Sequence, residues 1–184
     1  MQFAAAIYSA CSGMYPQAYA SLRTFLELGF AAIHFSANEL DRRKWIANKR
    51  DFSWSNALDE DGGLLSREFV TEFNPQAVDE AAKWASSAAQ RYRQCSEFIH
   101  GKHFVTVDLP KELSYSPKTT IEWLNCAKIS ALSLFYLIFI RYAHELLPNP
   151  DSDPLIEGLT SWFPDSAAVR ETLAHTRPTE IQGR

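Results

Sequence analysis

The chain has 184 residues and a mass of 20.9 kDa, which is enough for one domain with an appendage. Hydrophobic residues make up 46% of it and charged residues 22%, and this composition excludes a disordered chain. The formal net charge of −4 argues against a general polyanion binder, because nonspecific affinity for nucleic acids comes from Lys and Arg side chains that neutralise phosphates.

The first part of the chain carries the signals of three helices. We expect a helix from Gln2 to Ser12, which Gly13 ends. Pro16 suits the first turn of a longer helix, and Asn38 is the expected cap of a third one that runs to about Asn48. The longer helix has one face marked by apolar residues at a spacing of three and four: Tyr15, Tyr19, Leu22, Leu26, Gly29 and Ile33.

The middle of the chain combines a loop with two helices. Residues 51–65 contain Asp, Asn and Gly-Gly and are predicted to form a loop. A short helix is expected over residues 67–73, and a long one from Asn74 and Pro75 to about Ile99. The long helix has a regular stripe in which small residues dominate, so that a neighbouring helix can approach closely: Ala81, Ala85, Ala88, Tyr92, Cys95 and Ile99.

The next part of the chain holds one strand-like stretch and a last long helix. Residues 103–109 are predicted to form either a strand or an extended loop. Ser116-Pro117 and the capping box Thr119-x-x-Glu122 open a helix that continues to Leu147. Prolines just after this residue then end the helix.

These elements predict an all-α, up-and-down bundle of four to five helices. We place the bundle at residues 1–148 and a Pro-rich helical appendage at residues 149–184. Within the appendage we expect short helices over residues 155–162 and 165–175, followed by a frayed end. The run from Ile129 to Ile140 is apolar on all sides, so it should lie in the middle of the bundle.

Cysteine use and hydropathy indicate a soluble protein in a reducing compartment. Cys11, Cys95 and Cys126 are widely spaced and form no CxxC pair, which excludes a zinc knuckle and a thioredoxin-type motif. A secretory signal has Lys or Arg before its apolar stretch, and this sequence has neither there, so we expect no secretory signal. Residues 129–140 are fewer than the roughly 20 that span a membrane. We therefore expect a cytoplasmic protein that has no membrane partner.

Arg93 and His100 are the first candidates for chemistry. They stand on one face of the long helix, two turns apart, with Glu97 between them. A His can accept the proton of a ribose 2′-hydroxyl, and an Arg can stabilise the charge that develops on the phosphate. The alternative interpretation is structural. In it, Arg93 pairs with Glu97 on the surface, and His100, followed by Gly101, ends the helix where the dipole favours a His.

A second polar line on the second helix consists of Arg23, Glu27 and His34. A carboxylate among Phe and Leu side chains must find a partner, because an unpaired buried charge is costly. Arg23 is the local candidate, and Arg91 or Arg93 is a candidate from the long helix. Either the ion pair fixes the helix register, or Glu27 orients an Arg or a His of a functional site.

One basic cluster occurs, and aromatic residues are interleaved with it at Trp45, Phe52 and Trp54. Basic groups with aromatics can hold single-stranded RNA through phosphate contacts and base stacking. The alternative is a solvated helix whose Trp side chains pack on the bundle. The candidate RNA-binding cations are Arg42, Arg43, Lys44, Lys49 and Arg50.

The remaining polar patterns add no catalytic machinery. Arg141, His144 and Glu145 form a trio that we expect at the exposed end of the last helix. Arg170 and His175 also match the Arg-x(4–6)-His pattern, but this spacing sets the two side chains about 140° apart on a helix. The sequence contains no Ser/His/Asp or Cys/His series, no phosphate loop and no metal-ligand cluster, so we expect no metal and no cofactor.

Two segments of the chain together resemble the HEPN superfamily. They are YPQAYASLRTFLELGF at residues 15–30 and RYRQCSEFIHG at residues 91–101. A Trp-and-basic segment lies between them, and a very apolar helix follows. The chain looks most like a poorly characterised bacterial branch with an "LR…E" helix and a helix that ends in "HG". The resemblance covers about residues 13–147 and implies an all-α up-and-down bundle.

Many HEPN proteins are metal-independent endoribonucleases of toxin–antitoxin, phage-defence and CRISPR systems, and an Arg-x(4–6)-His motif usually forms their active site at a dimer interface. Here the motif falls on Arg93 and His100, and Gln94 stands where Asn, Asp or His usually follows the Arg. The resemblance therefore implies a dimeric ribonuclease or toxin, and we expect Arg23, Glu27 and Glu97 to support the site.

The resemblance also sets expectations about partners. RNA is the implied substrate, and an antitoxin or another defence subunit is the implied protein partner. HEPN members that have lost the motif act as binding or scaffold modules, so the alternative is a catalytically inactive helical interaction module. The small-residue stripe and the many aromatic side chains further favour a homodimer, since exposed apolar patches usually mark interfaces.

Overall fold

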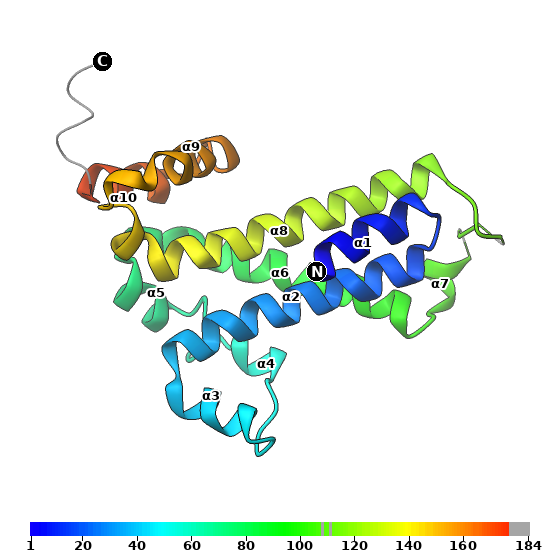
Figure 1. The fold of residues 1–184 in the computed structure, drawn as a ribbon, viewed down its shortest axis with the longest axis horizontal. Coiled ribbons are helices and arrows are strands. Elements are labelled where there is room, and N and C mark those ends of the chain that lie inside the picture. The colour runs from blue at the N-terminus through cyan, green and yellow to red at the C-terminus, as the bar shows by residue number, and fades with distance from the viewer. Residues whose placement is uncertain (108, 111, 177–184) are drawn as a thin grey trace. The chain divides into compact units, whose positions relative to one another are not determined.

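A computed structural model of the protein describes residues 1–107, 109–110 and 112–176 (Figure 1). These residues form helices and turns, and no β-strand occurs among them. The predicted all-α class is therefore confirmed. The chain divides into two compact units. Unit 1 consists of residues 1–32 and 86–134, and unit 2 consists of residues 33–85 and 135–184.

The helices follow one another along the chain with short connections. The elements before the middle of the chain are α1 (Gln2–Cys11), α2 (Tyr15–Ala37), α3 (Glu39–Ile46), α4 (Trp54–Ala57), α5 (Arg67–Phe73) and the 3-10 helix η1 (Pro75–Ala77). The later elements are α6 (Val78–Ile99), α7 (His103–Thr106), α8 (Pro117–Leu146), the 3-10 helix η2 (Pro150–Ser152), α9 (Asp153–Trp162) and α10 (Ala167–Thr176). Helices α2, α6 and α8 each contribute residues to both units.

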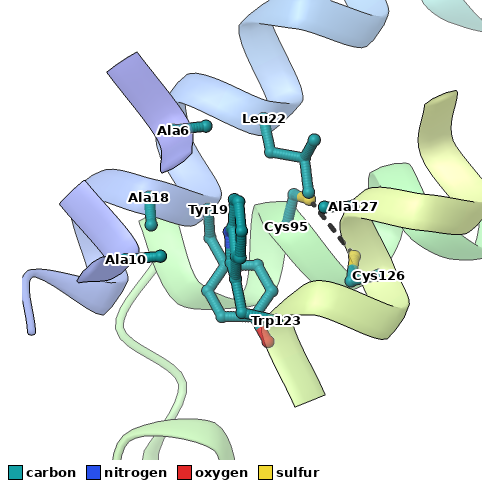
Figure 2. Packing of buried hydrophobic residues seen from close by; sticks show 9 residues of the cluster. All are labelled: Ala6, Ala10, Ala18, Tyr19, Leu22, Cys95, Trp123, Cys126 and Ala127. Atoms are coloured by element: carbon teal, nitrogen blue, oxygen red, sulfur yellow. Dashed lines mark hydrogen bonds between the residues drawn. The ribbon is translucent and has the colours of Figure 1, made fainter. Parts of the chain in front are cut away.

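The core of unit 1 packs two large rings among small side chains. Tyr19 of α2 and Trp123 of α8 are both 1% exposed, and the Tyr19 ring stacks on Phe98 of α6 with 3.8 Å between the ring centroids. Figure 2 shows how small residues from four helices surround these rings. The small members of the cluster are Ala6, Ala10, Ala18, Cys95, Cys126 and Ala127.

Two contacts fix α8 against α2 within unit 1. A Cβ atom added at Gly29 would lie 2.5 Å from a methyl carbon of Leu134, so a larger residue here would force the Leu134 side chain to move. At the start of α8, the backbone N–H of Ser116 donates to the Tyr15 hydroxyl at 2.7 Å. The Ser116 side chain in turn caps the backbone N–H of Thr119 at 3.4 Å. The predicted capping box at Thr119 is therefore wrong, because Ser116 already serves as the cap.

In unit 2 the carboxylate of Glu80 connects α6 to the start of α10. It accepts hydrogen bonds from the Ser166 hydroxyl at 2.7 Å, from the Ala168 backbone N–H at 3.1 Å and from the Tyr136 hydroxyl at 3.1 Å. Burial acts against the carboxylate, but these bonds outweigh burial and lower the pKa of Glu80. A carboxylate at this position also interacts favourably with the positive end of the α10 dipole.

Three local predictions differ from the structure. The segment predicted as a loop contains α4. The side chain of Ser53 caps the N-terminus of this helix, where it accepts a hydrogen bond from the Asn56 N–H at 3.3 Å. Residues 103–106 form α7 and no strand, since a single strand-like stretch has no neighbour to supply its backbone hydrogen bonds. Asn38 precedes α3 as predicted, but its side chain donates to the His34 carbonyl and does not cap the helix.

The C-terminal helices were predicted correctly, and the helix over residues 67–73 has the predicted bounds. Helices α9 and α10, which make up the predicted appendage, belong to unit 2. The frayed end predicted after residue 175 lies mostly outside the described residues. The stripe of small residues on α6 is used inside the chain, because Ala81 and Ala88 are at most 2% exposed.

Among the described helices, α8 is long and apolar enough to cross a membrane by length and composition alone. However, 56% of its most apolar window is buried within the protein, as in the core helix of a soluble protein. Phe135 and Ile138 on this helix stay partly exposed, so the run at residues 129–140 is not enclosed on all sides.

We predict that Glu80→Gln lowers the free energy of unfolding by about 2 kcal/mol at neutral pH, because an amide cannot satisfy three donors. The folded-state pKa of Glu80 is lowered, so its stabilising contribution is present above pH 4.5, the ordinary value, and is lost as the pH falls through the folded-state pKa. Urea denaturation at neutral and acidic pH measures both effects.

The matched control is Glu157→Gln on the exposed surface of α9, which should change the unfolding free energy by less than about 0.5 kcal/mol. The difference between wild type and Glu80→Gln should shrink in acid. An equal difference at neutral and acidic pH would contradict the role of the ionised carboxylate.

Candidate functional site

Arg93 lies on the exposed surface of α6, nearly two turns before its last residue Ile99, and the exposed His100 directly follows Ile99. Neither side chain has a hydrogen bond or an ion pair among the described residues. Their Cα atoms are separated by about 10 Å along the helix axis and share one face. The structure therefore presents both groups to solvent without bringing them into mutual contact.

The helix end at His100 is fixed by its backbone. The N–H of Gly101 donates to the Phe98 carbonyl at 3.2 Å, and the N–H of Lys102 donates to the Glu97 carbonyl at 3.1 Å. This pair of bonds is a Schellman motif, which requires a residue with positive φ, and Gly101 has a φ of 58°. His100 is therefore held in place by its main chain, while its imidazole is free to face solvent.

The groups next to this pair are engaged elsewhere. The Glu97 carboxylate lies 3.5 Å from the Lys102 ammonium, so the surface pair expected between Arg93 and Glu97 does not form. Gln94, which follows Arg93, accepts a hydrogen bond from the Arg91 guanidinium at 2.9 Å. Glu97 was predicted to support the site, but its carboxylate contacts Lys102 and not Arg93.

The second polar line is a three-membered network within unit 1. The Arg23 guanidinium donates to the Tyr92 hydroxyl at 2.6 Å and to the Glu27 carboxylate at 3.2 Å. The Tyr92 hydroxyl donates to the same Glu27 oxygen at 2.6 Å. The predicted pairing of Glu27 with Arg23 thus occurs, and neither Arg91 nor Arg93 takes part. His34, the third member of the predicted line, lies in unit 2 and contacts Asp41.

Burial and hydrogen bonding shift the pKa values of this network. Burial opposes the charge of Arg23, but the bonds to Tyr92 and the charge of Glu27 raise the pKa of the guanidinium. Burial also raises the pKa of Tyr92, and its bond to Glu27 acts in the same direction. Both shifts act at neutral pH in the same sense as the ordinary values, so that Arg23 stays charged and Tyr92 stays neutral. These groups are bound to one another, which indicates a structural role.

The predicted RNA-binding cations are largely paired with acidic residues of α3. The Glu39 carboxylate accepts from Arg42 at 2.6 Å and from Arg43 at 2.7 Å, and these two bonds lower the pKa of Glu39 to about 2. Asp41 lies 3.0 Å from Arg50 and 3.8 Å from Lys44. Lys49 is the remaining cation of the cluster, and its ammonium has no hydrogen bond or ion pair among the described residues.

The aromatic residues around this cluster pack on one another. Trp45 stacks on Phe35 with 5.1 Å between the ring centroids, and Phe52 meets the edges of Phe35 and His34. Trp45 is still 44% exposed. His34, Asp41, Arg50 and Phe52 also line a small polar hollow of about 120 Å³. Asp51 lines the hollow as well, so that two carboxylates face the single guanidinium of Arg50 and the hollow does not favour an anion.

The other candidate groups lie in structural contacts. The Arg141 guanidinium pairs with Glu145 at 2.8 Å, as predicted, and also lies 4.4 Å from the centre of the Phe73 ring. Arg170 donates to the Pro164 carbonyl, and His175 contacts the Glu171 carbonyl. Within the part of the chain that the structure describes, no three His, Cys, Asp or Glu side chains gather where they could hold a metal.

Comparisons with known proteins add no assignment: no family model, no curated protein and no solved structure matches this chain. The candidate site therefore depends on the residues themselves. Sequence reasoning missed the role of Tyr92 because it occupies the apolar stripe of α6. Its hydroxyl gave the one available signal, since a buried Tyr usually finds a hydrogen-bond partner.

We predict that Tyr92→Phe lowers the free energy of unfolding by about 1 kcal/mol, because it removes one acceptor from Arg23 and one donor to Glu27. The effect stays near this value because the Arg23 and Glu27 side chains are 26% and 33% exposed and water can replace part of the bonding. Tyr8→Phe, at a side chain that is 70% exposed, is the control. Identical urea midpoints for the two variants would contradict a stabilising network.

Proposed function

We propose that the protein is a metal-independent endoribonuclease of the HEPN type, with His100 as the base and Arg93 as the group that stabilises charge on the phosphate. The observation that carries the proposal is that both side chains stand on one exposed face of α6 with no partner among the described residues. A His can remove the proton of a ribose 2′-hydroxyl, and an Arg can stabilise the developing negative charge.

The spacing of the two groups favours a site that a second copy completes. About 10 Å separates Arg93 from His100 along α6, which is more than one phosphodiester group spans. In a two-fold dimer, His100 of one copy and Arg93 of the other can approach the same phosphate. Exposed apolar side chains of unit 1, Ile121 and Leu124 on α8 among them, are surfaces on which such a dimer can form.

The remaining parts of the proposal follow from the resemblance. A cytoplasmic toxin or phage-defence nuclease of this type has RNA as its substrate and an antitoxin or another defence subunit as its partner. Contact with RNA in the segment of residues 42–50 depends mainly on Lys49 and the exposed Trp45, because Glu39 and Asp41 neutralise much of the charge of the other cations.

We predict RNA cleavage in the presence of EDTA, with products that end in 2′,3′-cyclic phosphate, because the proposed mechanism uses 2′-hydroxyl attack with a His and an Arg. His100→Ala should lower the rate by about 10²–10⁴-fold. Arg93→Ala should lower it comparably, by leaving the developing charge unstabilised. Cleavage of bulk RNA by wild type and the variants, followed by analysis of the product ends, measures these effects.

Thermal melts and one matched variant serve as controls. Neither substitution should lower the melting temperature, because both side chains are exposed. His175→Ala, at the second Arg-x(4–6)-His match, should leave activity intact. Equal cleavage by wild type and His100→Ala would contradict the proposed base.

We further predict that mixing two inactive variants restores activity. If each site takes Arg93 from one copy and His100 from the other, a mixed dimer of Arg93→Ala and His100→Ala contains one intact site. Co-refolding or co-expression of the two variants should therefore recover up to about half of the wild-type activity per mixed dimer. No recovery, in a sample that light scattering shows to be dimeric, would place both residues in a site within one chain.

A second candidate function is that of a catalytically inactive helical interaction module. The observation that favours it is an apolar hollow of about 230 Å³ between α8 and α9, within unit 2. Phe135, Ile138, Tyr142, Leu155 and Trp162 are among the residues that line the hollow, and Trp162 is 45% exposed. Absence of cleavage by the wild-type chain together with its partner would favour this module over the nuclease.

A further inference from the structure

Cys95 of α6 and Cys126 of α8 form a pair of buried thiols in the core of unit 1. Their Sγ atoms are 3.9 Å apart, and both residues are 0% exposed (Figure 2). They are 31 positions apart in the sequence and are brought together by the packing of the two helices. Cys11 is the other cysteine of the chain, and it is exposed.

The surroundings of the pair isolate it from other reactive groups. Tyr19, Leu22, Trp123 and Ala127 belong to the same buried cluster, which excludes bulky reagents. Within the described part of the chain, no third metal-binding side chain gathers with the two thiols. Each sulfur therefore has the other as its nearest reaction partner.

The two thiols are electrostatically unequal. The contact with the Cys95 sulfur lowers the pKa of Cys126; burial opposes this effect, and the positive charge of Arg91 adds to it. The same contact, together with burial, raises the pKa of Cys95. Because thiolates and not thiols are the nucleophiles, Cys126 is the sulfur favoured to react first.

We propose that Cys95 and Cys126 are a redox modification site, which a small two-electron oxidant of the peroxide class converts into a disulfide while the protein remains folded. The proposal does not depend on ribonuclease activity. It rests on the contact between the two sulfurs and on their shared burial, which favours reaction of one with the other over reaction with a second chain.

The chemistry balances with hydrogen peroxide as the oxidant. The Cys126 thiolate attacks one peroxide oxygen, the O–O bond breaks, and the departing hydroxide takes up a proton to form water. The resulting sulfenic acid is attacked by Cys95. The S–S bond then forms, the S–O bond breaks, and the proton of Cys95 leaves with the hydroxide as a second water. Two thiols lose two electrons in total, and one peroxide is reduced to two waters.

Formation of the bond requires the sulfur separation to fall from 3.9 Å to about 2.05 Å. Rotation about the cysteine side-chain bonds, with a slight approach of α6 and α8, supplies this movement. The small neighbour Ala127 offers little steric resistance. The disulfide would tie the helix that carries Arg93 and His100 to α8.

The test uses the full chain with Cys11→Ser, so that the two buried cysteines are the thiols left. The reduced protein is treated with hydrogen peroxide under native conditions, and its thiols are counted with a maleimide after unfolding. We expect both thiols to disappear together, with a mass loss of two hydrogen atoms and monomeric migration on a non-reducing gel. A peptide that links Cys95 to Cys126 should be found, and dithiothreitol should restore both thiols.

Single variants provide the matched controls. In Cys95→Ser the remaining Cys126 has no partner, so that oxidation should add oxygen to the chain. In Cys126→Ser the remaining Cys95 likewise has no partner, so that its oxidation should also add oxygen to the chain. The proposal is overturned if both thiols survive a peroxide dose that fully oxidises Cys11 in the wild-type chain. It is equally overturned if the pair gains oxygen atoms, or if the disulfide forms only after circular dichroism shows loss of helix.

Discussion

Close packing of helices at small side chains is the constraint on which unit 1 depends. Alanines and cysteines from four helices leave room for the rings of Tyr19 and Trp123, and Gly29 leaves room for Leu134. This short separation also lets the Arg23 guanidinium of α2 reach the Tyr92 hydroxyl of α6. A larger residue at one of these positions would therefore disturb the polar contacts as well as the core, since protein interiors have little free volume.

The charged groups of the protein are mostly committed to neighbours that the fold supplies. Glu27, Glu39, Asp41 and Glu80 each accept two or more hydrogen bonds or ion pairs. Arg93 and His100 differ from this pattern, because their side chains have no hydrogen bond or ion pair among the described residues. In residues 42–50, by contrast, the paired carboxylates reduce the capacity of the basic side chains to bind phosphate. Counting basic residues along the chain overstated this capacity, because the carboxylates of Glu39 and Asp41 pair with most of them.

The sequence predicted elements that have strong local signals and missed those that depend on distant partners. The helix at residues 67–73 and the two C-terminal helices follow from local periodicity and from nearby prolines. The Arg23–Glu27 pair was predictable because the two residues are one turn apart. The hydrogen bonds of Tyr92 and the contact between Cys95 and Cys126 were not predictable, because each depends on which helix packs against α6.

The bonds of Glu80 have a consequence for the order of folding during synthesis. Ser166 and Ala168, two of its donors, are made 86 and 88 residues after Glu80, so that α6 leaves the ribosome long before they exist. Until then this carboxylate must remain hydrated, and unit 2 cannot close around it. Residues up to 134 suffice for unit 1, which can therefore pack first, while the segments of unit 2 wait for the last helix.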